Sequence, residues 1–350
     1  MKRIAVIEPQ FDGRSANATN PLRIGVIGCG RWGKNYIRNF SSLGSSVVNA
    51  VCDCDHGKLI PLNGLKTETK VFDSYERLFA SGLCDAVVVS SIASTHYSIA
   101  KSALQAGLDV LVEKPLALSL EQADELVHLS SSHNRILMVA HTFLFNHGIR
   151  TIKKYIQEGR CGEIFYVKAR RTHLGPIRED VNVIWDLAPH EIAILLYLLD
   201  EMPSSIQILS RKCLHPDRED VAFVNLVFPS KTIASLTLSW LDPHRERYLD
   251  IVGSKARIVF DDLSSQPIQI FPAGILANGE QHPHFGERPP SVREAHVINP
   301  KIPREEPMKV LCQEFLQAIA TGTRPLSDGQ FAREVIALLC RIQGAMHGAD

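Results

Sequence analysis

Residues 22–33 read LRIGVIGCGRWG, a strand-like apolar run followed by Gly28, Gly30 and Gly33 in the spacing Gly-x-Gly-x-x-Gly. Short glycine patterns recur by chance, but here a helical pattern follows, and Asp53 lies twenty residues beyond Gly33 at the end of a second strand-like run. In a dinucleotide-binding turn the first glycine permits the tight bend, the second lets the backbone approach the pyrophosphate, and the third lets the helix pack closely. We therefore predict a dinucleotide site, with an ordinary strand-to-helix turn as the alternative.

Strand-like and helical patterns alternate around this turn as far as residue 140. Strands separated by helices predict a doubly wound parallel sheet, a Rossmann domain, over residues 22–141. Residues 1–21 are predicted to be an N-terminal extension, in which residues 1–7 form either a short edge strand or a tail. The expected strands are 22–27, 47–52, 86–89, 109–112 and 136–140, with a short element from residue 72, and the expected helices are 75–79, 96–106 and 120–129.

The pattern changes after residue 141, where several strand-like runs follow one another without helices between them. This favours a largely antiparallel open sheet in an α+β domain over residues 142–350, which would bind substrate and form oligomers. The whole chain is therefore predicted to be an α/β protein. The expected helices are 149–157, 186–199, 310–320 and 331–346, the expected strands are 164–170, 205–210, 221–228, 233–240, 247–252 and 256–260, and residues 273–307 are a predicted surface loop.

Composition excludes several classes of protein. The chain has 350 residues, 45% of them hydrophobic and 22% charged, and its formal net charge is zero, as is typical of a globular protein that has no nucleic acid or membrane surface as its main partner. Eight cysteines are scattered without a Cys-x-x-Cys pair, and this usage suits a reducing cytoplasm. Cys52 and Cys54 lie two apart at the end of a strand-like run, and packing is preferred over metal binding for this pair. His282-x-His284 has a spacing that suits a metal, but since no partner cluster accompanies it we predict no metal site.

Three residues are candidates for chemistry on a secondary alcohol. Lys114, in Glu113-Lys114-Pro115, follows an apolar run, and the carboxyl ends of parallel strands face the dinucleotide crevice. Asp186 and His190 lie four apart, so they share one face of the expected helix. We predict that His190 is the general base, that Lys114 stabilises the developing alkoxide, and that Asp186 orients the hydroxyl or the ammonium. The alternatives are a helix cap for Asp186 and a core histidine for His190.

Other residues are candidates for ligand contacts. Asp53 should accept hydrogen bonds from an adenosine ribose and repel a 2′-phosphate, which favours NAD over NADP. The following residues offer no arginine for that phosphate, and only His56 is a weak signal the other way. Arg171, Arg178 and Asn182 flank the helix that carries His190, with Trp185 beside them. A planar guanidinium suits a diphosphate or a carboxylate, with a solvated loop charge as the alternative.

Three motifs in order resemble the glucose–fructose oxidoreductase, inositol dehydrogenase and MocA family: the glycine turn continued by Arg31-Trp32-Gly33-Lys34-Asn35, the segment 103–115 that ends in Glu113-Lys114-Pro115, and Asp186-x-x-x-His190. The resemblance covers residue 22 to the C-terminus. One departure is Ser91-Ile92, where the family usually has Thr-Pro. The resemblance implies further cofactor contacts, at Arg31, Trp32, Ser91, His96, Glu113 and Lys114.

Residues 173–190 resemble a narrower group, the dehydrogenases that oxidise the sugar C3 hydroxyl of UDP-N-acetylglucosamine or its uronic acid. The expectation is thus an NAD-dependent oxidoreductase acting on CH–OH groups of a nucleotide sugar. The alternatives are a dehydrogenase of free sugars or cyclitols and a non-catalytic NAD-sensing regulator. By analogy with related sheets, a homodimer or homotetramer is expected.

Overall fold

The computed structural model describes residues 21–59, 68–175, 177–272 and 296–347, together with two short strands at 275–276 and 291–292. The predicted N-terminal extension and most of the predicted loop at 273–307 lie outside these residues. The described chain forms two compact units. Unit 1 comprises the described residues up to Thr142 and Glu305–Ala337, and unit 2 comprises Phe143–Arg304 and the residues from Leu338 onward.

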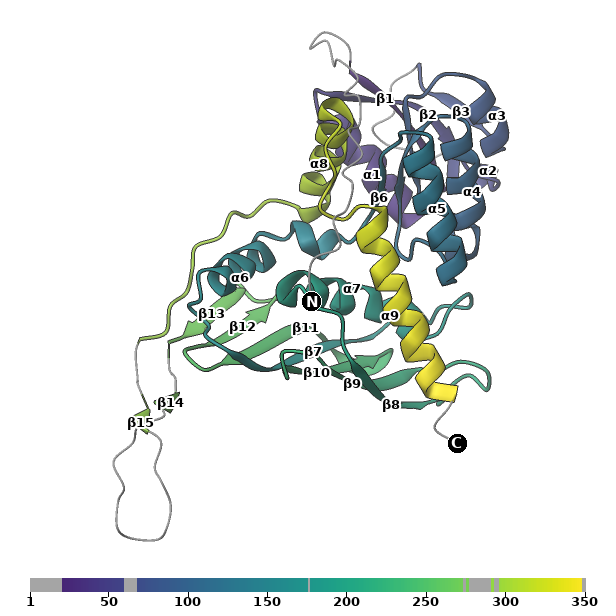
Figure 1. The fold of residues 1–350 in the computed structure, drawn as a ribbon. Coiled ribbons are helices and arrows are strands. Elements are labelled where there is room, and N and C mark those ends of the chain that lie inside the picture. The colour runs from purple at the N-terminus through teal and green to yellow at the C-terminus, as the bar shows by residue number, and fades with distance from the viewer. Residues whose placement is uncertain are drawn as a thin grey trace, which may run out of the picture. The chain divides into compact units, whose positions relative to one another are not determined.

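Unit 1 is built on a six-stranded sheet in the order β3-β2-β1-β4-β5-β6, and every pair of neighbours is parallel (Figure 1). The predicted Rossmann sheet is therefore confirmed. Strands β4 and β5 are buried along their whole length because helices cover both faces. The strands are β1 (Leu22–Ile27), β2 (Ser46–Cys52), β3 (Lys70–Phe72), β4 (Ala86–Val89), β5 (Asp109–Val112) and β6 (Leu137–Val139).

Helices of unit 1 lie on opposite faces of this sheet. The strand order reverses after β3, and right-handed crossovers then place the later helices on the face opposite α1. Helices α3, α4 and α5 pack side by side on that face, while α1 contacts α8 on the other (Figure 1). The helices are α1 (Arg31–Ser42), α2 (His56–Leu59), α3 (Tyr75–Ala80), α4 (Ala93–Gln105), α5 (Leu120–Ser132), α8 (Pro307–Thr321) and the first part of α9 (Gly329–His347).

The predicted domain division placed everything after residue 141 in one domain. In the structure, Glu305–Ala337, with α8 and the first part of α9, belongs to unit 1. The ring of Phe315 on α8 packs edge-on against Phe40 of α1, with centroids 6.4 Å apart. The Ser327 hydroxyl donates to the Val139 carbonyl at the end of β6. Both contacts join residues that lie far apart in the sequence, 188 positions in the case of Ser327 and Val139. The helical periodicity of α8 therefore did not reveal which sheet this helix covers.

Unit 2 is built on a seven-stranded sheet in the order β13-β12-β11-β7-β10-β9-β8. Only β7 and β10 pair in parallel, so the prediction of a largely antiparallel sheet is confirmed. The long helix α7 and the helix α6 lie on one face of the sheet (Figure 1). The elements are η1 (Thr142–Phe145), α6 (His147–Gln157), β7 (Ile164–Leu174), α7 (Val183–Leu199), β8 (Ser205–Arg211), β9 (Val221–Val227), β10 (Ile233–Ser239), β11 (Leu241–Gly253), β12 (Arg257–Asp261) and β13 (Ile268–Phe271).

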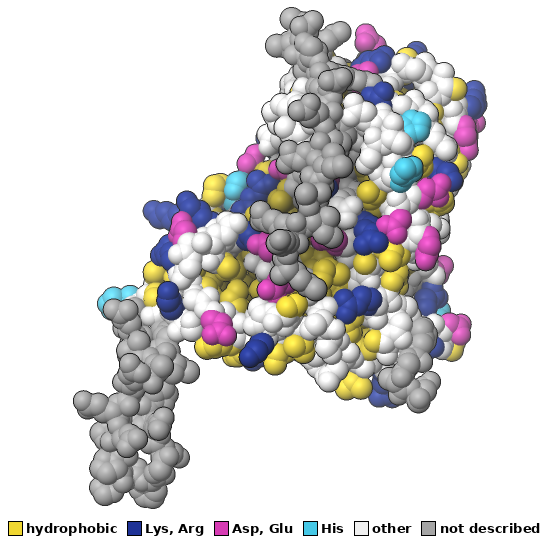
Figure 2. Space-filling model, in the orientation of Figure 1, with side chains coloured by type: hydrophobic (Ala, Val, Ile, Leu, Met, Phe, Trp, Pro, Cys, Tyr) yellow, Lys and Arg dark blue, Asp and Glu magenta, His cyan; other side chains and the backbone are white. Residues whose placement is uncertain are grey.

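The other face of this sheet carries exposed apolar side chains. Leu209 is paired with Phe223 across β8 and β9, and Ile233 lies on the same face of β10. These three side chains are 76%, 50% and 49% exposed. On the face of the molecule that Figure 2 draws, hydrophobic side chains are interspersed with basic and acidic ones. The exposed apolar side chains of the sheet are compatible with the expected homo-oligomer, which stays a prediction.

Candidate functional site

The strands of unit 1 end level with one another, and this places the candidate residues of that unit along one edge. Ile27 is paired with Cys52 on one side and with Val89 on the other, and Val89 is paired with Val112. The residues that follow these four therefore open loops at the same edge of the sheet. The candidates in these loops, or in the first turn of the next helix, are Gly28, Gly30, Arg31, Trp32, Gly33, Asp53, Ser91, His96, Glu113 and Lys114.

The glycine turn requires glycine for the reasons that the sequence predicted. Gly28 has φ +87°, and a Cβ there would lie 2.6 Å from the Ser91 amide nitrogen. A Cβ on Gly33 would lie 1.9 Å from the Gly28 carbonyl oxygen, so α1 packs against the turn itself. Gly30, at the start of α1, has no atom within 4 Å of its Cβ position. A pyrophosphate can therefore approach the first amides of α1 closely, as binding at a helix N-terminus requires.

Asp53 fixes this turn to the end of β2. Its carboxylate, which is 7% exposed, accepts hydrogen bonds from the Cys29 amide at 2.8 Å and from the Asp55 amide at 2.9 Å. A carboxylate accepts about four hydrogen bonds, so capacity remains for a ribose hydroxyl. Together the open cradle and this carboxylate fit an NAD cofactor.

We expect Asp53→Asn to narrow the preference for NAD over NADP. The amide keeps an acceptor oxygen for the Cys29 amide but removes the charge that repels a 2′-phosphate. Loss of about 1.4 kcal/mol of repulsion would narrow the ratio of the two dissociation constants about tenfold. Calorimetric titration of both cofactors measures this ratio, with Asp55→Asn as the control. A wild-type preference for NADP would show that the role assigned to Asp53 is wrong.

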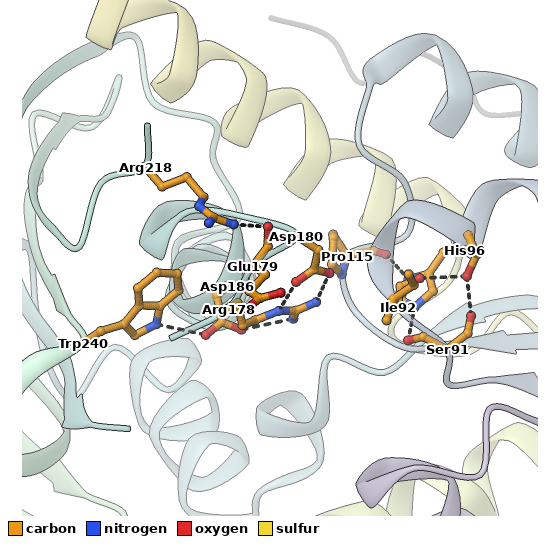
Figure 3. A network of polar contacts seen from close by, with 11 residues as sticks. Ser91, Ile92, His96, Pro115, Arg178, Glu179, Asp180, Asp186, Arg218 and Trp240 are labelled. Carbon is orange, nitrogen blue, oxygen red and sulfur yellow. Dashed lines mark hydrogen bonds and ion pairs between the residues drawn. The ribbon is translucent and has the colours of Figure 1, made fainter. Parts of the chain in front are cut away.

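Glu113, Ser91 and His96 bond to the protein itself at this edge. The Tyr36 hydroxyl donates to Glu113 Oε1 at 2.7 Å, and Glu113 Oε2 accepts from the Lys114 amide at 3.1 Å. The ring nitrogens of His96 lie 2.7 Å from the Pro115 carbonyl and 3.1 Å from the Ser91 carbonyl (Figure 3). These contacts join the loops that follow β4 and β5. Tyr36 was not a candidate in the sequence.

His141 follows β6 and is 2% exposed. Among the residues that the structure describes, neither of its ring nitrogens has a hydrogen-bond partner. Burial, and to a smaller extent the charge of Lys114, lowers the pKa of His141 to about 3. His141 is therefore neutral near pH 7 and adds no second positive charge beside Lys114.

The low pKa of His141 predicts a loss of stability in acid. Between about pH 6.5 and the folded-state value, the unfolded chain binds a proton at this ring and the folded chain does not, so the free energy of unfolding falls as the pH falls. From about pH 7 to about pH 5 this amounts to about 2 kcal/mol. Denaturant unfolding at both pH values measures this change. The free energy of unfolding of His141→Leu should change by about 2 kcal/mol less than that of wild type between the two pH values. His128→Leu, at an exposed histidine of α5, should keep the wild-type dependence, and an unchanged slope in His141→Leu would contradict the assignment.

In unit 2, Asp186 and His190 lie on one helix, α7, as predicted, but the helix begins three residues earlier than predicted. Asn182 is the cap, because its Oδ1 accepts from the Trp185 amide at 3.1 Å. Asp186 is thus in the first turn without being the cap. Pro189 is the seventh helical residue, so the Trp185 carbonyl lacks the amide that would normally bond to it.

Asp186 is held by two donors in unit 2. The indole of Trp240, a residue only 1% exposed, donates to Oδ2 at 3.1 Å. Arg178 donates to Oδ1 at 3.3 Å and also to Asp180 at 2.8 Å (Figure 3). The carboxylate of Asp186 is therefore oriented from both sides, and Arg178 is shared between two carboxylates. Trp240 was predicted only as the end of a strand.

His190 packs against an aromatic ring that the sequence did not single out. The rings of Phe143 and His190 meet edge to face, with centroids 5.4 Å apart and planes at 69°. The Arg171 guanidinium covers the same Phe143 ring at 4.3 Å from its centroid, and it forms a buried ion pair with Glu191. Arg171 thus supports the surroundings of His190 from inside unit 2.

Asn182 and Trp185 differ in how their side chains are used. Besides capping α7, Asn182 donates to Glu219 at 2.8 Å and to Gln343 at 3.2 Å, so its amide is engaged on both sides. Trp185 is partly exposed. A substrate role for Trp185 stays a prediction, and the same holds for Arg171, Arg178 and Asn182.

The described residues contain no group of three or more His, Cys, Asp or Glu that could hold a metal ion. The predicted pair His282 and His284 lies outside the described residues. Within those ranges, no helix is both long enough and apolar enough to cross a bilayer.

Comparison with known proteins gives two family models in tandem. Residues 22–141 match the oxidoreductase family with an NAD-binding Rossmann fold, and residues 149–259 match the GFO/IDH/MocA C-terminal domain. UDP-N-acetylglucosamine 3-dehydrogenase of Acidithiobacillus ferrooxidans is 25% identical over 330 residues, which cover 93% of this chain and 97% of that protein. Inositol 2-dehydrogenase of Serratia proteamaculans is 30% identical over 214 residues, or 59% of this chain and 62% of that protein.

Among solved structures, the WlbA dehydrogenase of Bordetella pertussis, in complex with NADH and UDP-GlcNAcA, superposes with a TM-score of 0.77. The match covers 95% of this chain and 98% of that one, at 20% identity. At this identity the superposition shows that the two proteins share their fold.

Proposed function

The chain belongs to the Gfo/Idh/MocA family of NAD-dependent oxidoreductases, and we propose that it oxidises the C3 hydroxyl of UDP-N-acetylglucosamine or of its uronic acid. The observation that carries the proposal is the match to a UDP-N-acetylglucosamine 3-dehydrogenase along almost the full length of both chains. The placement of Asp186 and His190 on one helix supports it, because an alcohol dehydrogenase needs an oriented base.

The proposed reaction converts the secondary alcohol to a ketone. Bound NAD supplies the nicotinamide ring that accepts the hydride from the sugar carbon. His190 takes the hydroxyl proton, Lys114 stabilises the negative charge that develops on the oxygen, and Asp186 orients the hydroxyl or the ammonium. Because Lys114 belongs to unit 1 and His190 to unit 2, the proposal requires both side chains to reach the same hydroxyl.

Arg178, whose guanidinium lies beside α7, supports an anionic substrate. We propose that a diphosphate draws Arg178 away from Asp180 and Asp186, since a guanidinium binds phosphate oxygens in the same bidentate way.

The second candidate is oxidation of a free sugar or cyclitol. The match to an inositol 2-dehydrogenase favours it, although that match spans less of both chains. A panel of UDP-N-acetylglucosamine, its uronic acid, free N-acetylglucosamine and myo-inositol, assayed with NAD by NADH absorbance, separates the two. The proposal expects the UDP compounds to give most of the turnover. Turnover with only free N-acetylglucosamine or myo-inositol would establish the second candidate instead.

A further inference from the structure

We propose that Tyr36 and His96 are positioning residues that hold the Glu113-Lys114-Pro115 turn, and with it Lys114, in place for the reaction. The inference rests on the proposed function in one respect, because it takes Lys114 as the group that acts on the substrate. It assigns to Tyr36 a role that the sequence did not suggest, and it gives His96 and Glu113 a role other than the cofactor contacts that the resemblance implied.

Tyr36 secures the residue before Lys114. It lies on α1, is fully buried, and donates its hydroxyl to Glu113 Oε1. Burial, followed by the charge of Glu113, raises the pKa of Tyr36 well above its usual value, so the hydroxyl stays a donor. A hydrogen bond from a hydroxyl to a carboxylate is among the stronger kinds, and a buried carboxylate is costly without such partners. Tyr36 thereby fixes the direction of the Glu113 side chain.

Glu113 passes this constraint to Lys114 itself. Its second oxygen accepts the Lys114 amide at 3.1 Å, so one carboxylate joins α1 to the backbone of the lysine. The helix that begins at the glycine turn is thereby tied to the turn that carries the lysine. The two parts of unit 1 expected to meet the cofactor and the sugar hydroxyl share one rigid connection.

His96 secures the residue after Lys114. Its ring is 1% exposed and lies in the first turn of α4, between the Pro115 carbonyl and the Ser91 carbonyl. Carbonyl oxygens only accept hydrogen bonds, and a neutral imidazole carries a single N–H, so the ring donates to one of the two carbonyls. The shorter distance, 2.7 Å against 3.1 Å, assigns this bond to the Pro115 carbonyl. The Ser91 and Thr95 hydroxyls, 2.7 Å apart, hold the start of the same helix. His96 thus ties the loop after β5 to the loop after β4.

The backbone is therefore held on both sides of Lys114, at Glu113 and at Pro115. Catalysis depends on such placement, since a shift of about 1 Å can lower a rate about 100-fold. Loosening either contact should therefore lower kcat while leaving the affinity for NAD nearly unchanged. A purely structural role would instead lower the stability of unit 1 and the affinity for the cofactor together.

The test compares Tyr36→Phe with Tyr97→Phe, which removes a hydroxyl that donates to Glu125 from α4 in the same unit. With UDP-N-acetylglucosamine and NAD, we expect Tyr36→Phe to lower kcat about 10- to 100-fold. Its dissociation constant for NAD, measured by calorimetry, should stay within a few-fold of wild type. Tyr97→Phe should match wild type in both. For the second contact, His96→Leu should behave as Tyr36→Phe does, and His96→Gln, which keeps an N–H donor, should recover part of the loss.

A second readout does not depend on turnover. Competitive labelling of lysines with acetic anhydride across a pH series, read by mass spectrometry on the cofactor-free protein, reports the surroundings of Lys114. Tyr36→Phe should change the labelling profile of Lys114 and leave that of Lys154, on α6, unchanged. Wild-type labelling of Lys114 in both Tyr36→Phe and His96→Leu would overturn the inference, as would a kcat within twofold of wild type in both. If Lys114→Met keeps its turnover, or wild type shows none with this sugar, the proposed function fails, and the labelling alone decides whether the turn is held.

Discussion

Lys114→Met and His190→Asn should each lower kcat by about 10² to 10⁴ while the affinity for NAD stays within a few-fold of wild type. Neither substitution touches the glycine turn or Asp53, which provide the cradle expected for the cofactor. Methionine keeps the lysine side chain as far as the Cε position but removes the cation that stabilises the alkoxide. Asparagine fits the space beside Phe143 but does not take a proton near neutral pH.

Two exposed residues serve as matched controls for this pair. Lys154→Met alters a lysine whose side chain is 79% exposed, and His128→Asn alters an exposed histidine of α5. Both controls should keep wild-type turnover. The profile of kcat/KM against pH should lose its acid limb in His190→Asn, because that limb reports the base of the free enzyme. Near-normal turnover of His190→Asn across pH would show that Lys114 or a water molecule is the base.

The second large effect concerns Arg178. UDP-N-acetylglucosamine should bind far more tightly than free N-acetylglucosamine, and Arg178→Ala should erase much of that difference. Hydrogen bonds to charged groups contribute about 1.5–3 kcal/mol each, so the loss should be about 10- to 100-fold in affinity for the UDP sugar alone. Calorimetry with both sugars on the NAD-loaded protein measures it. Equal affinity of wild type for the two sugars would contradict the nucleotide-sugar proposal.

The structure refines this experiment, because Arg178 also bonds to Asp186. Arg178→Lys keeps the charge beside Asp186 and should lose less affinity than Arg178→Ala. Arg171 is a poor probe of substrate binding, since it forms a buried ion pair with Glu191. Removing one partner of such a pair costs about 3–5 kcal/mol of stability. Arg171→Ala should therefore lower the melting temperature far more than Arg178→Ala does.

The parallel sheet could be predicted because its central strands β4 and β5 are short, largely apolar runs and its turn carries three glycines in a characteristic spacing. Strands β7 and β11 were predicted too short because the residues that extend them are mostly polar or charged. Their added residues include Arg171 and Glu246, which look like loop residues in isolation. In the sheet, neighbouring charges on the two strands pair, as Arg170 does with Glu246 at 3.0 Å.

The candidate residues themselves were found from motifs, while the residues that hold them were not. Tyr36 meets Glu113 across 77 positions, and Trp240 meets Asp186 across 54. Local periodicity marks both simply as buried aromatic positions. Only the fold brings the hydroxyl of one and the indole of the other to a carboxylate. The cap formed by Asn182 was missed in a similar way, because a polar residue before an apolar helix suits both a cap and a ligand contact. Its substrate role stays a prediction.

The central claim is that hydride leaves C3 of a UDP-hexosamine. We would test it by a single turnover with UDP-N-acetylglucosamine that carries deuterium at C3, followed by mass spectrometry of the reduced cofactor. The same experiment is done with the uronic acid of this sugar, also deuterated at C3. We expect the NADH formed to carry the deuterium, and sugar labelled at C4 to yield unlabelled NADH. Unlabelled NADH from the C3-labelled sugars, or labelled NADH from the C4-labelled sugar, would contradict the claim.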